Sequence, residues 1–135
     1  MTTKSIRILL ILLGIFHAAN GLSSLLAPDY WYATVPGVTA TGPLNHHFLT
    51  DISLAFLASA AGLLMAFRTG PTAAAFALAG ATWPALHGVF HLWEWMSDGL
   101  PGNTQELVST GIGVIVLSFA GFWLAWVWAH REGVV

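Results

Sequence analysis

Residues 72–96 read TAAAFALAGATWPALHGVFHLWEWM, an apolar stretch with a single charged residue, Glu94, and two histidines, His87 and His91. The stretch exceeds the about 20 residues that a helix needs to cross roughly 30 Å of hydrocarbon. It is continuous and rich in Ala and Leu, without the alternation of a strand. It therefore predicts a membrane-spanning helix that carries three polar side chains in its second half.

Three further apolar stretches surround it, at residues 6–27, 47–67 and 106–129. Segments rich in Gly and Pro separate the four stretches, as expected of turns. Of the 135 residues, 56% are hydrophobic and 7% are charged, whereas a soluble domain carries about 25% charged residues. The sequence thus predicts an all-α integral membrane four-helix bundle, in one transmembrane domain covering residues 1–135. A signal peptide is the alternative interpretation of the first stretch.

The basic residues indicate the orientation in the membrane. Lys4 and Arg7 precede the first predicted span, Arg68 ends the second, and Arg131 follows the fourth. All four then lie on one side, so that both termini are expected in the cytoplasm. Trp126 and Trp128 are expected to mark the inner interface. The net charge of −2 argues against a nucleic-acid partner.

Most of the polar residues within the predicted spans gather near the opposite, outer side. At about 100° per residue, His91 lies roughly 40° from His87, and Glu94 lies about 20° away on the other side. On the second span, His47 and Asp51 share a face with small residues, which indicates that this face points into the bundle. His17 shares its face with two glycines. The residues expected around one outer cavity are His17, Asn20, His47, Asp51, His87, His91 and Glu94. Trp83 is expected at mid-depth, where it would line the cavity or face a partner subunit.

Imidazoles one helical turn apart, with a carboxylate nearby, are typical of a metal site. Without sulfur ligands, copper, zinc or iron is favoured, and haem is a further possibility. The candidate metal ligands are His17, His47, His87, His91 and Glu94. Asn20 and Trp83, together with His17, are candidate cofactor-binding residues. Asp51 and Glu94 are candidate catalytic residues, as a proton relay or as groups that orient a histidine. The competing interpretation is a hydrogen-bonded ladder that only fixes helix packing.

The segments TGPLNHHFLTDISLAFLASAAGL and ALHGVFHLWEW resemble a family of small four-span bacterial membrane proteins that is loosely similar to the DoxX-like group. The resemblance covers residues 27–95. It implies a bacterial cytoplasmic membrane and a four-helix arrangement, and no catalytic residue is transferred from it. Quinone-linked oxidoreductase subunits occur among DoxX-like proteins, and this favours redox chemistry by analogy.

The sequence therefore predicts a membrane protein with a His and carboxylate metal or haem site in the outer half of the bilayer, linked to redox chemistry. Its partners would be the lipid bilayer and a lipophilic substrate such as a quinone. Two alternatives remain open. One is a non-catalytic accessory subunit that associates with other membrane subunits or with itself. The other is a protein that binds a quinone or another lipophilic ligand through its histidines.

Overall fold

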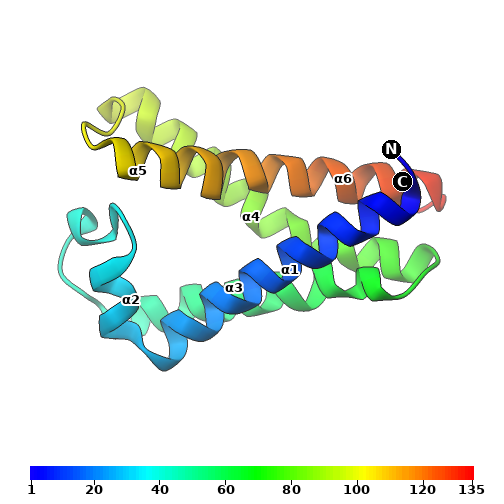
Figure 1. Ribbon diagram of the computed structural model, residues 1–135, viewed down its shortest axis with the longest axis horizontal. Helices are drawn as coiled ribbons and strands as arrows, with labels where there is room; N and C mark the ends of the chain where they lie inside the picture. The colour runs from blue at the N-terminus through cyan, green and yellow to red at the C-terminus, as the bar shows by residue number, and fades with distance from the viewer.

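The computed structural model describes all residues 1–135, and every regular element in it is a helix (Figure 1). Three of the long helices are α1, α3, which continues into the short η2, and α4. The fourth is built from α5, the π-helix η3 and α6 in succession. Two short helices, α2 and η1, follow α1. The bounds are Thr3–Leu26 for α1, Pro28–Thr34 for α2, Val38–Thr41 for η1, His46–Leu64 for α3, Met65–Phe67 for η2, Pro71–Asp98 for α4, Thr104–Val108 for α5, Ser109–Val116 for η3 and Leu117–Arg131 for α6.

Four segments are long and apolar enough to cross a membrane: Thr3–Leu26, His46–Phe67, Pro71–Asp98 and Thr104–Arg131. They confirm the all-α fold and lie within a few residues of the spans expected from the sequence. Large apolar side chains such as Leu12, Leu86 and Trp123 remain exposed on them. A bilayer covers such side chains, so their exposure is expected of a membrane-spanning bundle.

Local sequence chemistry sets the helix ends. The Thr2 side chain accepts a hydrogen bond from the backbone N–H of Ser5 at the start of α1, and the Asn45 side chain accepts one from Phe48 at the start of α3. α4 begins with Pro71, whose missing N–H costs nothing in the first turn, and it ends before Gly99 at a φ of 92°. The helix boundaries therefore follow from residues that the sequence itself displays.

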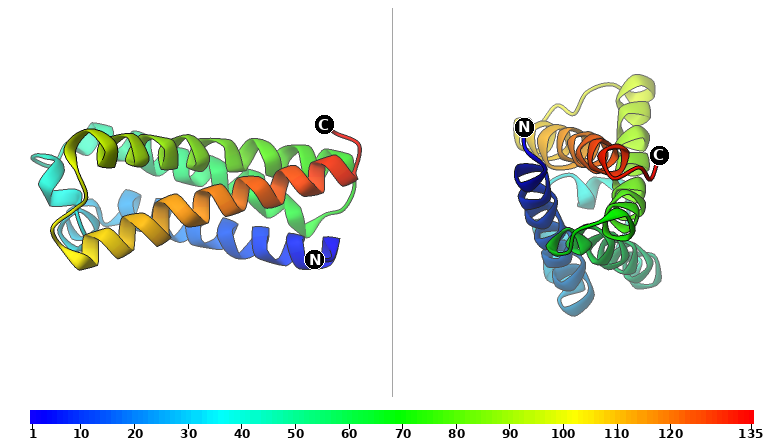
Figure 2. Two further views of the ribbon diagram at one scale, coloured as in Figure 1. Left: turned by 90° about the horizontal axis from the view of Figure 1, so that it is seen from above. Right: turned by 90° about the vertical axis from the view of Figure 1, so that its right-hand side faces the viewer.

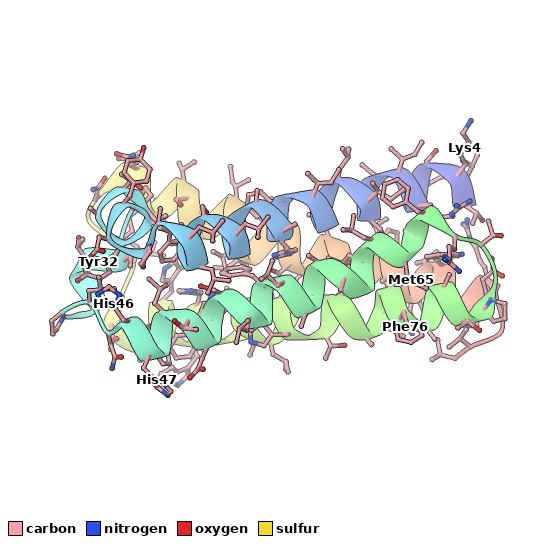
Figure 3. The ribbon with its side chains drawn as sticks, turned by 90° about the horizontal axis from the view of Figure 1, so that it is seen from below. Lys4, Tyr32, His46, His47, Met65 and Phe76 are labelled. Carbon is pink, nitrogen blue, oxygen red and sulfur yellow. The ribbon has the colours of Figure 1, made fainter.

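The two chain termini lie together at one end of the bundle, which we call the terminal end; the opposite end, with α2 and η1, is the distal end (Figure 1). Arg131 joins the termini by donating to the carbonyl of Met1 at 3.3 Å. Lys4 lies at this same end (Figure 3). The shared location of the basic residues agrees with the sequence, but which side of the membrane the terminal end faces remains a prediction.

The helices pack in the order α1, α3, α4 and α6, and α6 returns to α1 (Figure 2). α3 and α4 make their closest approach where Gly62 meets Gly80. A Cβ atom added to Gly62 would lie 2.7 Å from the Gly80 Cα atom, so only glycine fits there. This contact confirms the expectation that small residues of the second span allow a neighbouring helix to approach closely.

The buried apolar core lies in the terminal half, where α1, α3, α4 and α6 all contribute residues such as Leu10, Leu63, Ala77 and Leu124. Trp128 is completely buried in it. Its indole N–H donates to Glu132 at 3.0 Å, and the guanidinium carbon of Arg7 lies 5.9 Å from its ring centroid. The expectation that Trp128 marks a membrane interface is therefore wrong, because the indole finds its polar partner inside the protein.

Away from this core the helices separate. Figure 1 shows α1 and α3 diverging from α4 and the α5–α6 segment toward the distal end. The contacts that join α1 to α6 involve Leu13 with Gly121, Arg7 with Trp128, and Arg131 with the N-terminus. These contacts lie in the terminal half and the middle of the bundle, so the distal half is the less closely packed part.

Candidate functional site

His87, His91 and Glu94 form a connected row on α4, as the sequence predicts. Nδ1 of His91 lies 2.8 Å from a carboxylate oxygen of Glu94, and Nε2 of His91 lies 3.3 Å from Nε2 of His87. The histidines are four residues apart and the glutamate follows three residues later, so all three side chains meet on one helical face. We call these three residues the α4 triad.

The Glu94 contact selects one form of the His91 ring. A carboxylate accepts hydrogen bonds, so the nitrogen beside it, Nδ1, carries the proton. In the neutral ring the other nitrogen, Nε2, then carries a lone pair, and this lone pair points toward Nε2 of His87. The α4 triad is therefore able to present an imidazole nitrogen as a hydrogen-bond acceptor or as a metal ligand.

A row of aromatic rings continues from the α4 triad across the bundle. His87 stacks on Trp83, with ring centroids 5.2 Å apart and an angle of 8° between the planes. The edge of Trp83 meets Phe56 of α3 at 5.0 Å, and Phe56 stacks on His17 of α1 at 5.6 Å. Ring contacts through Phe56 and Trp83 thus link His17 to His87, and no hydrogen bond joins His17 to the triad.

Phe56 is the member of this row that the sequence analysis missed. It lies on α3 among small residues and apolar residues, in the stretch LAFLASA at residues 54–60. A large aromatic ring in such a stretch is an ordinary core residue by its sequence alone. Only the packing of α3 between α1 and α4 indicates its role, because that packing sets Phe56 between His17 and Trp83.

His17 faces into the bundle, as expected from the glycines on its face. Gly14 and Gly21 both lie against α3: a Cβ atom at Gly14 would be 2.9 Å from the Leu64 side chain, and one at Gly21 would be 2.9 Å from the Ser53 carbonyl oxygen. His17 itself is only 7% exposed, and its Nδ1 atom has no hydrogen-bond partner. This histidine is therefore a buried polar group whose needs the protein alone does not meet.

Asn20 lies near His17 in the sequence, yet it is not joined to the row by a hydrogen bond. Its side-chain amide donates to the carbonyl of Phe16 at 3.2 Å, within α1. The backbone carbonyl of Asn20 accepts a hydrogen bond from the Ser24 hydroxyl at 2.8 Å. The contacts of Asn20 thus serve the local helix, and a cofactor-binding role for it stays a prediction.

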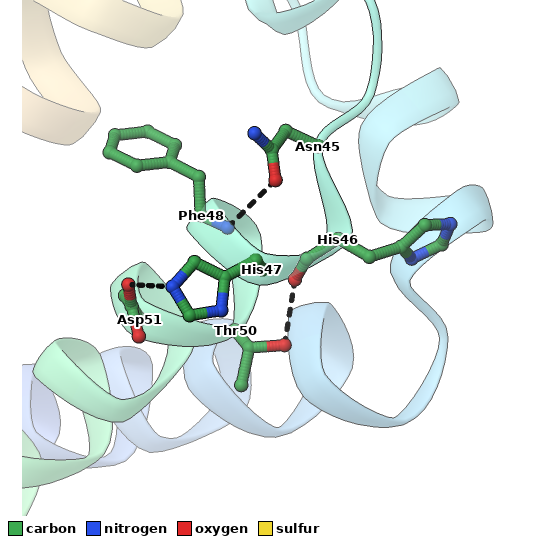
Figure 4. Close-up of polar contacts among 6 residues, drawn as sticks. All are labelled: Asn45, His46, His47, Phe48, Thr50 and Asp51. Atoms are coloured by element: carbon green, nitrogen blue, oxygen red, sulfur yellow. Dashed lines mark hydrogen bonds and ion pairs between the residues drawn. The ribbon is translucent and has the colours of Figure 1, made fainter.

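His47 and Asp51 form a separate pair on α3, with 3.6 Å between the ring nitrogen and the carboxylate (Figure 4). Their side chains are 90% and 60% exposed. The expectation that this face points into the bundle is therefore wrong at the distal end. The reason is the crossing at Gly62 and Gly80: beyond it α3 and α4 diverge, so no helix covers the face where His47 lies.

A groove also lies along α3 and α4 where the two helices cross. It has a volume of about 680 Å³ and is open to the surface of the bundle. Its lining residues are Ala55, Ala58, Ser59, Ala61, Gly62, Met65, Phe76, Ala79, Gly80 and Trp83. Met65 and Phe76 lie toward the terminal end, and His47 lies at the other end of the bundle (Figure 3). The helical period places Trp83 and the α4 triad along one face of α4, so the apolar groove leads toward polar side chains.

The fourth span has an unusual turn beside this region. Residues Ser109–Val116 form the π-helix η3, which packs against α4. A Cβ atom at Gly111 would lie 3.2 Å from the ring of Trp95, the residue that follows Glu94. The glycine therefore leaves room for this ring. π-Helical turns are rare and occur often at functional sites. This turn therefore supports a functional interpretation of the distal half of α4.

No three or more His, Asp or Glu side chains are arranged so that they could hold a metal ion by themselves. The structure joins His87, His91 and Glu94 in one cluster and leaves His17, His47 and Asp51 outside it. Two imidazole nitrogens that converge, with a carboxylate behind one of them, can share a proton or provide part of a metal site.

Comparison with known proteins adds no assignment: the chain matches no protein family, no curated protein and no solved structure. The geometry of the α4 triad and of the groove therefore carries the functional assignment.

Proposed function

We propose that this chain is a multi-pass membrane protein that binds a metal ion through His87 and His91 and uses it in redox-linked chemistry. The observation that supports this proposal is the 3.3 Å separation between the two Nε2 atoms. Metal–nitrogen bonds of about 2.0–2.1 Å at a tetrahedral zinc ion place two ligand nitrogens about 3.3–3.4 Å apart. A hydrogen bond between the two rings has the same separation, so the metal content of the purified protein decides between the two.

Glu94 gives this proposal its second support. A histidine that binds a metal through one nitrogen usually donates its other N–H to a carboxylate or carbonyl group, which fixes the ring and increases its basicity. The 2.8 Å contact between Nδ1 of His91 and Glu94 has this form. Glu94 is then a positioning residue for His91, and the metal candidates remain copper, zinc and iron.

Only two protein ligands come from the α4 triad, so the remaining positions would be filled by water or by an oxygen atom of a substrate. Open positions are typical of catalytic metal sites rather than structural ones. Haem remains a further possibility, and the absorption spectrum below tests it. A metal bound to the two histidines would supply electron-transfer or Lewis-acid chemistry.

The test is to purify the protein in a mild detergent and to measure its metal content and absorption spectrum together, before and after metal is supplied. We expect about one metal ion per chain, and loss of that ion in His87→Ala and in His91→Ala. His46→Ala and His130→Ala are matched controls, because both residues are exposed and lie outside the triad. Retention of metal in both triad variants would contradict the proposal, and a Soret band would instead indicate haem.

A second candidate function is the binding of a lipid-soluble ligand, and the groove between α3 and α4 favours it. The groove is almost entirely apolar and ends at Trp83, which stacks on His87. A molecule with a hydrocarbon tail and an oxygen-containing head, such as a quinone, would place its tail along Ala58 and Ala79 and its head near His87. This arrangement would let an imidazole N–H donate to the head group.

Mass spectrometry of organic extracts from the purified protein tests this second function. We expect one defined lipophilic compound with the wild-type protein, and its loss in Ala79→Leu, in which a larger side chain fills the groove. Ala19→Leu is the control, since Ala19 is exposed on α1. If wild type and both variants carry only the same bulk lipids, the ligand-binding function is excluded.

Two broader expectations stay proposals from the sequence. The bacterial cytoplasmic membrane is implied by the DoxX-like resemblance, and the distribution of basic residues supports cytoplasmic termini. An accessory role in a larger complex predicts that the purified chain lacks both metal and ligand and associates with other subunits. A purified chain with neither metal nor a defined ligand in the two experiments above would therefore favour the accessory role.

A further inference from the structure

The two imidazoles of the α4 triad are held in place in different ways. His91 is fixed by the contact of its Nδ1 atom with Glu94 at 2.8 Å. The His87 side chain has no such partner, since its one hydrogen-bonding contact is the 3.3 Å contact with His91 itself. The torsion that turns a histidine ring about its Cβ–Cγ bond has broad minima. Packing must therefore set the plane of the His87 ring.

Trp83 supplies this packing, one helical turn before His87. The two rings are nearly parallel, with an angle of 8° between their planes and 5.2 Å between their centroids. Phe90, three residues after His87, lies farther away at 6.4 Å and is 47% exposed. A turn of the His87 ring out of its plane would break the stack with Trp83, and stacked aromatic pairs contribute energy beyond their buried area. Trp83 is therefore the main restraint on the plane of this ring.

Trp83 is itself held from a second helix. Its ring meets that of Phe56 on α3 edge to face, with centroids 5.0 Å apart and planes at 78°, an arrangement that aromatic pairs prefer. Phe56 in turn stacks on His17 of α1 at 5.6 Å. Nearby, the close contact of Gly62 with Gly80 fixes α3 against α4. The packing of α3 thus reaches a site whose three polar residues all lie on α4.

The plane of the His87 ring decides whether the two Nε2 atoms converge. The rings of His87 and His91 are nearly perpendicular, with planes at 79° and centroids 4.6 Å apart, and this arrangement brings the Nε2 atoms to 3.3 Å. A metal ion needs both lone pairs directed at one point. A turned His87 ring would therefore remove one of only two protein ligands, even with the residue still in place. Groups that orient a metal ligand affect metal affinity strongly for this reason.

We propose that Trp83 is a positioning residue for His87, whose Nε2 atom its stacked ring directs toward Nε2 of His91. Phe56 supports Trp83 from α3. Trp83 then does for His87 what Glu94 does for His91. This inference rests on the proposed function, because the converging nitrogens form the proposed metal site. The orientation of the ring is nevertheless a property of the metal-free chain, so it can be measured whether or not metal binds.

The experiment uses the full chain in detergent micelles, with ¹⁵N-labelled histidine and without metal, and records the scalar coupling between the two Nε2 atoms by NMR. This coupling passes through an N–H···N hydrogen bond and disappears when His87 turns away. A second sample of each variant is titrated with Co²⁺, whose absorption spectrum reports the geometry of its ligands. The wild-type protein should show the coupling and bind Co²⁺.

Trp83→Leu is the decisive variant, because it keeps apolar bulk but removes the ring. We expect it to lose the coupling and to bind Co²⁺ about 10-fold more weakly, whereas Trp83→Phe, which keeps a flat ring, should restore both. Trp93→Leu makes the same change at an exposed position of α4 and should leave both measurements at the wild-type values. Phe56→Leu serves if Trp83→Leu does not fold, and we expect a reduced coupling and an affinity for Co²⁺ lowered about threefold.

An absent coupling in the wild-type protein, or an unchanged one in folded Trp83→Leu, would overturn the proposal. A coupling that depends on Trp83 in a chain that binds no Co²⁺ would support the positioning role and contradict only the metal site. Co²⁺ binding that is equally strong in the wild-type protein and in Trp83→Leu would do the reverse: the metal site would stand, and Trp83 would have no positioning role in it.

Discussion

In the terminal half of the bundle, polar side chains complete the fold, whereas in the distal half the three residues of the α4 triad bond to one another. Arg7 donates to the carbonyls of Ala66 and Phe67 where α3 and η2 end, at 2.9 and 3.1 Å. These carbonyls lack helical partners, so the arginine meets a structural need. The α4 triad, by contrast, caps no helix end and joins no second helix by a hydrogen bond.

This difference separates two reasons for placing polar residues in a membrane protein. The polar groups of the terminal half are explained by helix ends and by the buried indole of Trp128. No comparable structural need explains His87, His91 and Glu94. Ionisable groups within a membrane are costly and usually functional. The comparison therefore assigns stability to the terminal half and makes the distal half the place to look for function.

The largest stability effect should come from Trp128→Ala in the terminal core. The ring is completely buried, and we expect a loss of about 3 kcal/mol in the free energy of unfolding. This value lies at the low end for buried aromatic residues, since packing rather than transfer from water holds membrane helices together. Equilibrium unfolding in mixed micelles measures it. Trp123→Ala, at an exposed position, is the control, and equal losses in the two variants would contradict this account.

A smaller stability loss is expected at the crossing that divides the two halves. In Gly80→Ala the new Cβ atom would lie 2.8 Å from the Gly62 Cα atom and equally close to the backbone of Ser59 and Leu63. Backbone cannot move aside as a flexible side chain can, so we expect a loss of about 2 kcal/mol. Gly113→Ala is the matched control, because nothing lies within 4 Å of its added Cβ atom. If Gly80→Ala is as stable as the wild-type protein, then α3 and α4 lie farther apart at the crossing than the structure shows.

The sequence predicts the fold well because the features that fix it are local. The length of each apolar stretch gives the spans, and caps such as Asn45 and breaks such as Gly70–Pro71 give their ends. The spacing of His87, His91 and Glu94 within one helix likewise predicts their contacts, because the helical period alone sets it. These parts of the prediction needed no knowledge of how the helices pack.

The contacts between helices were harder to predict. His47 has the same small-residue pattern along its face as an inward-pointing residue, and that pattern does place Gly62 against α4. It does not reveal that the two helices diverge beyond the crossing. Phe56 was missed and Trp128 was placed wrongly for a related reason. The surroundings of an aromatic ring depend on the neighbouring helices rather than on the helix that carries the ring.

Within the α4 triad, Glu94→Gln should change metal binding far more than stability. Loss of the carboxylate weakens the hold on His91, and changes to such supporting residues typically lower metal affinity by about 10–100-fold. The pair is half-buried, and we expect its contribution to the free energy of unfolding to be below about 1 kcal/mol. Metal titration and unfolding of the same sample measure both effects. Asp98→Asn, an exposed change on α4, is the control, and an equal loss of affinity there would show that Glu94 acts only through net charge.

The smallest effects are expected at His47 and Asp51, which lie in the distal half yet outside the triad. Their 3.6 Å contact is exposed, and exposed ion pairs contribute about 0–1 kcal/mol to stability. We expect His47→Ala and Asp51→Asn to keep wild-type metal content and to change the free energy of unfolding by less than about 0.5 kcal/mol. Metal analysis is the informative measurement. If either variant loses metal as His91→Ala does, then α3 and α4 must close over the site in the membrane, and the distal half has a second, tighter arrangement.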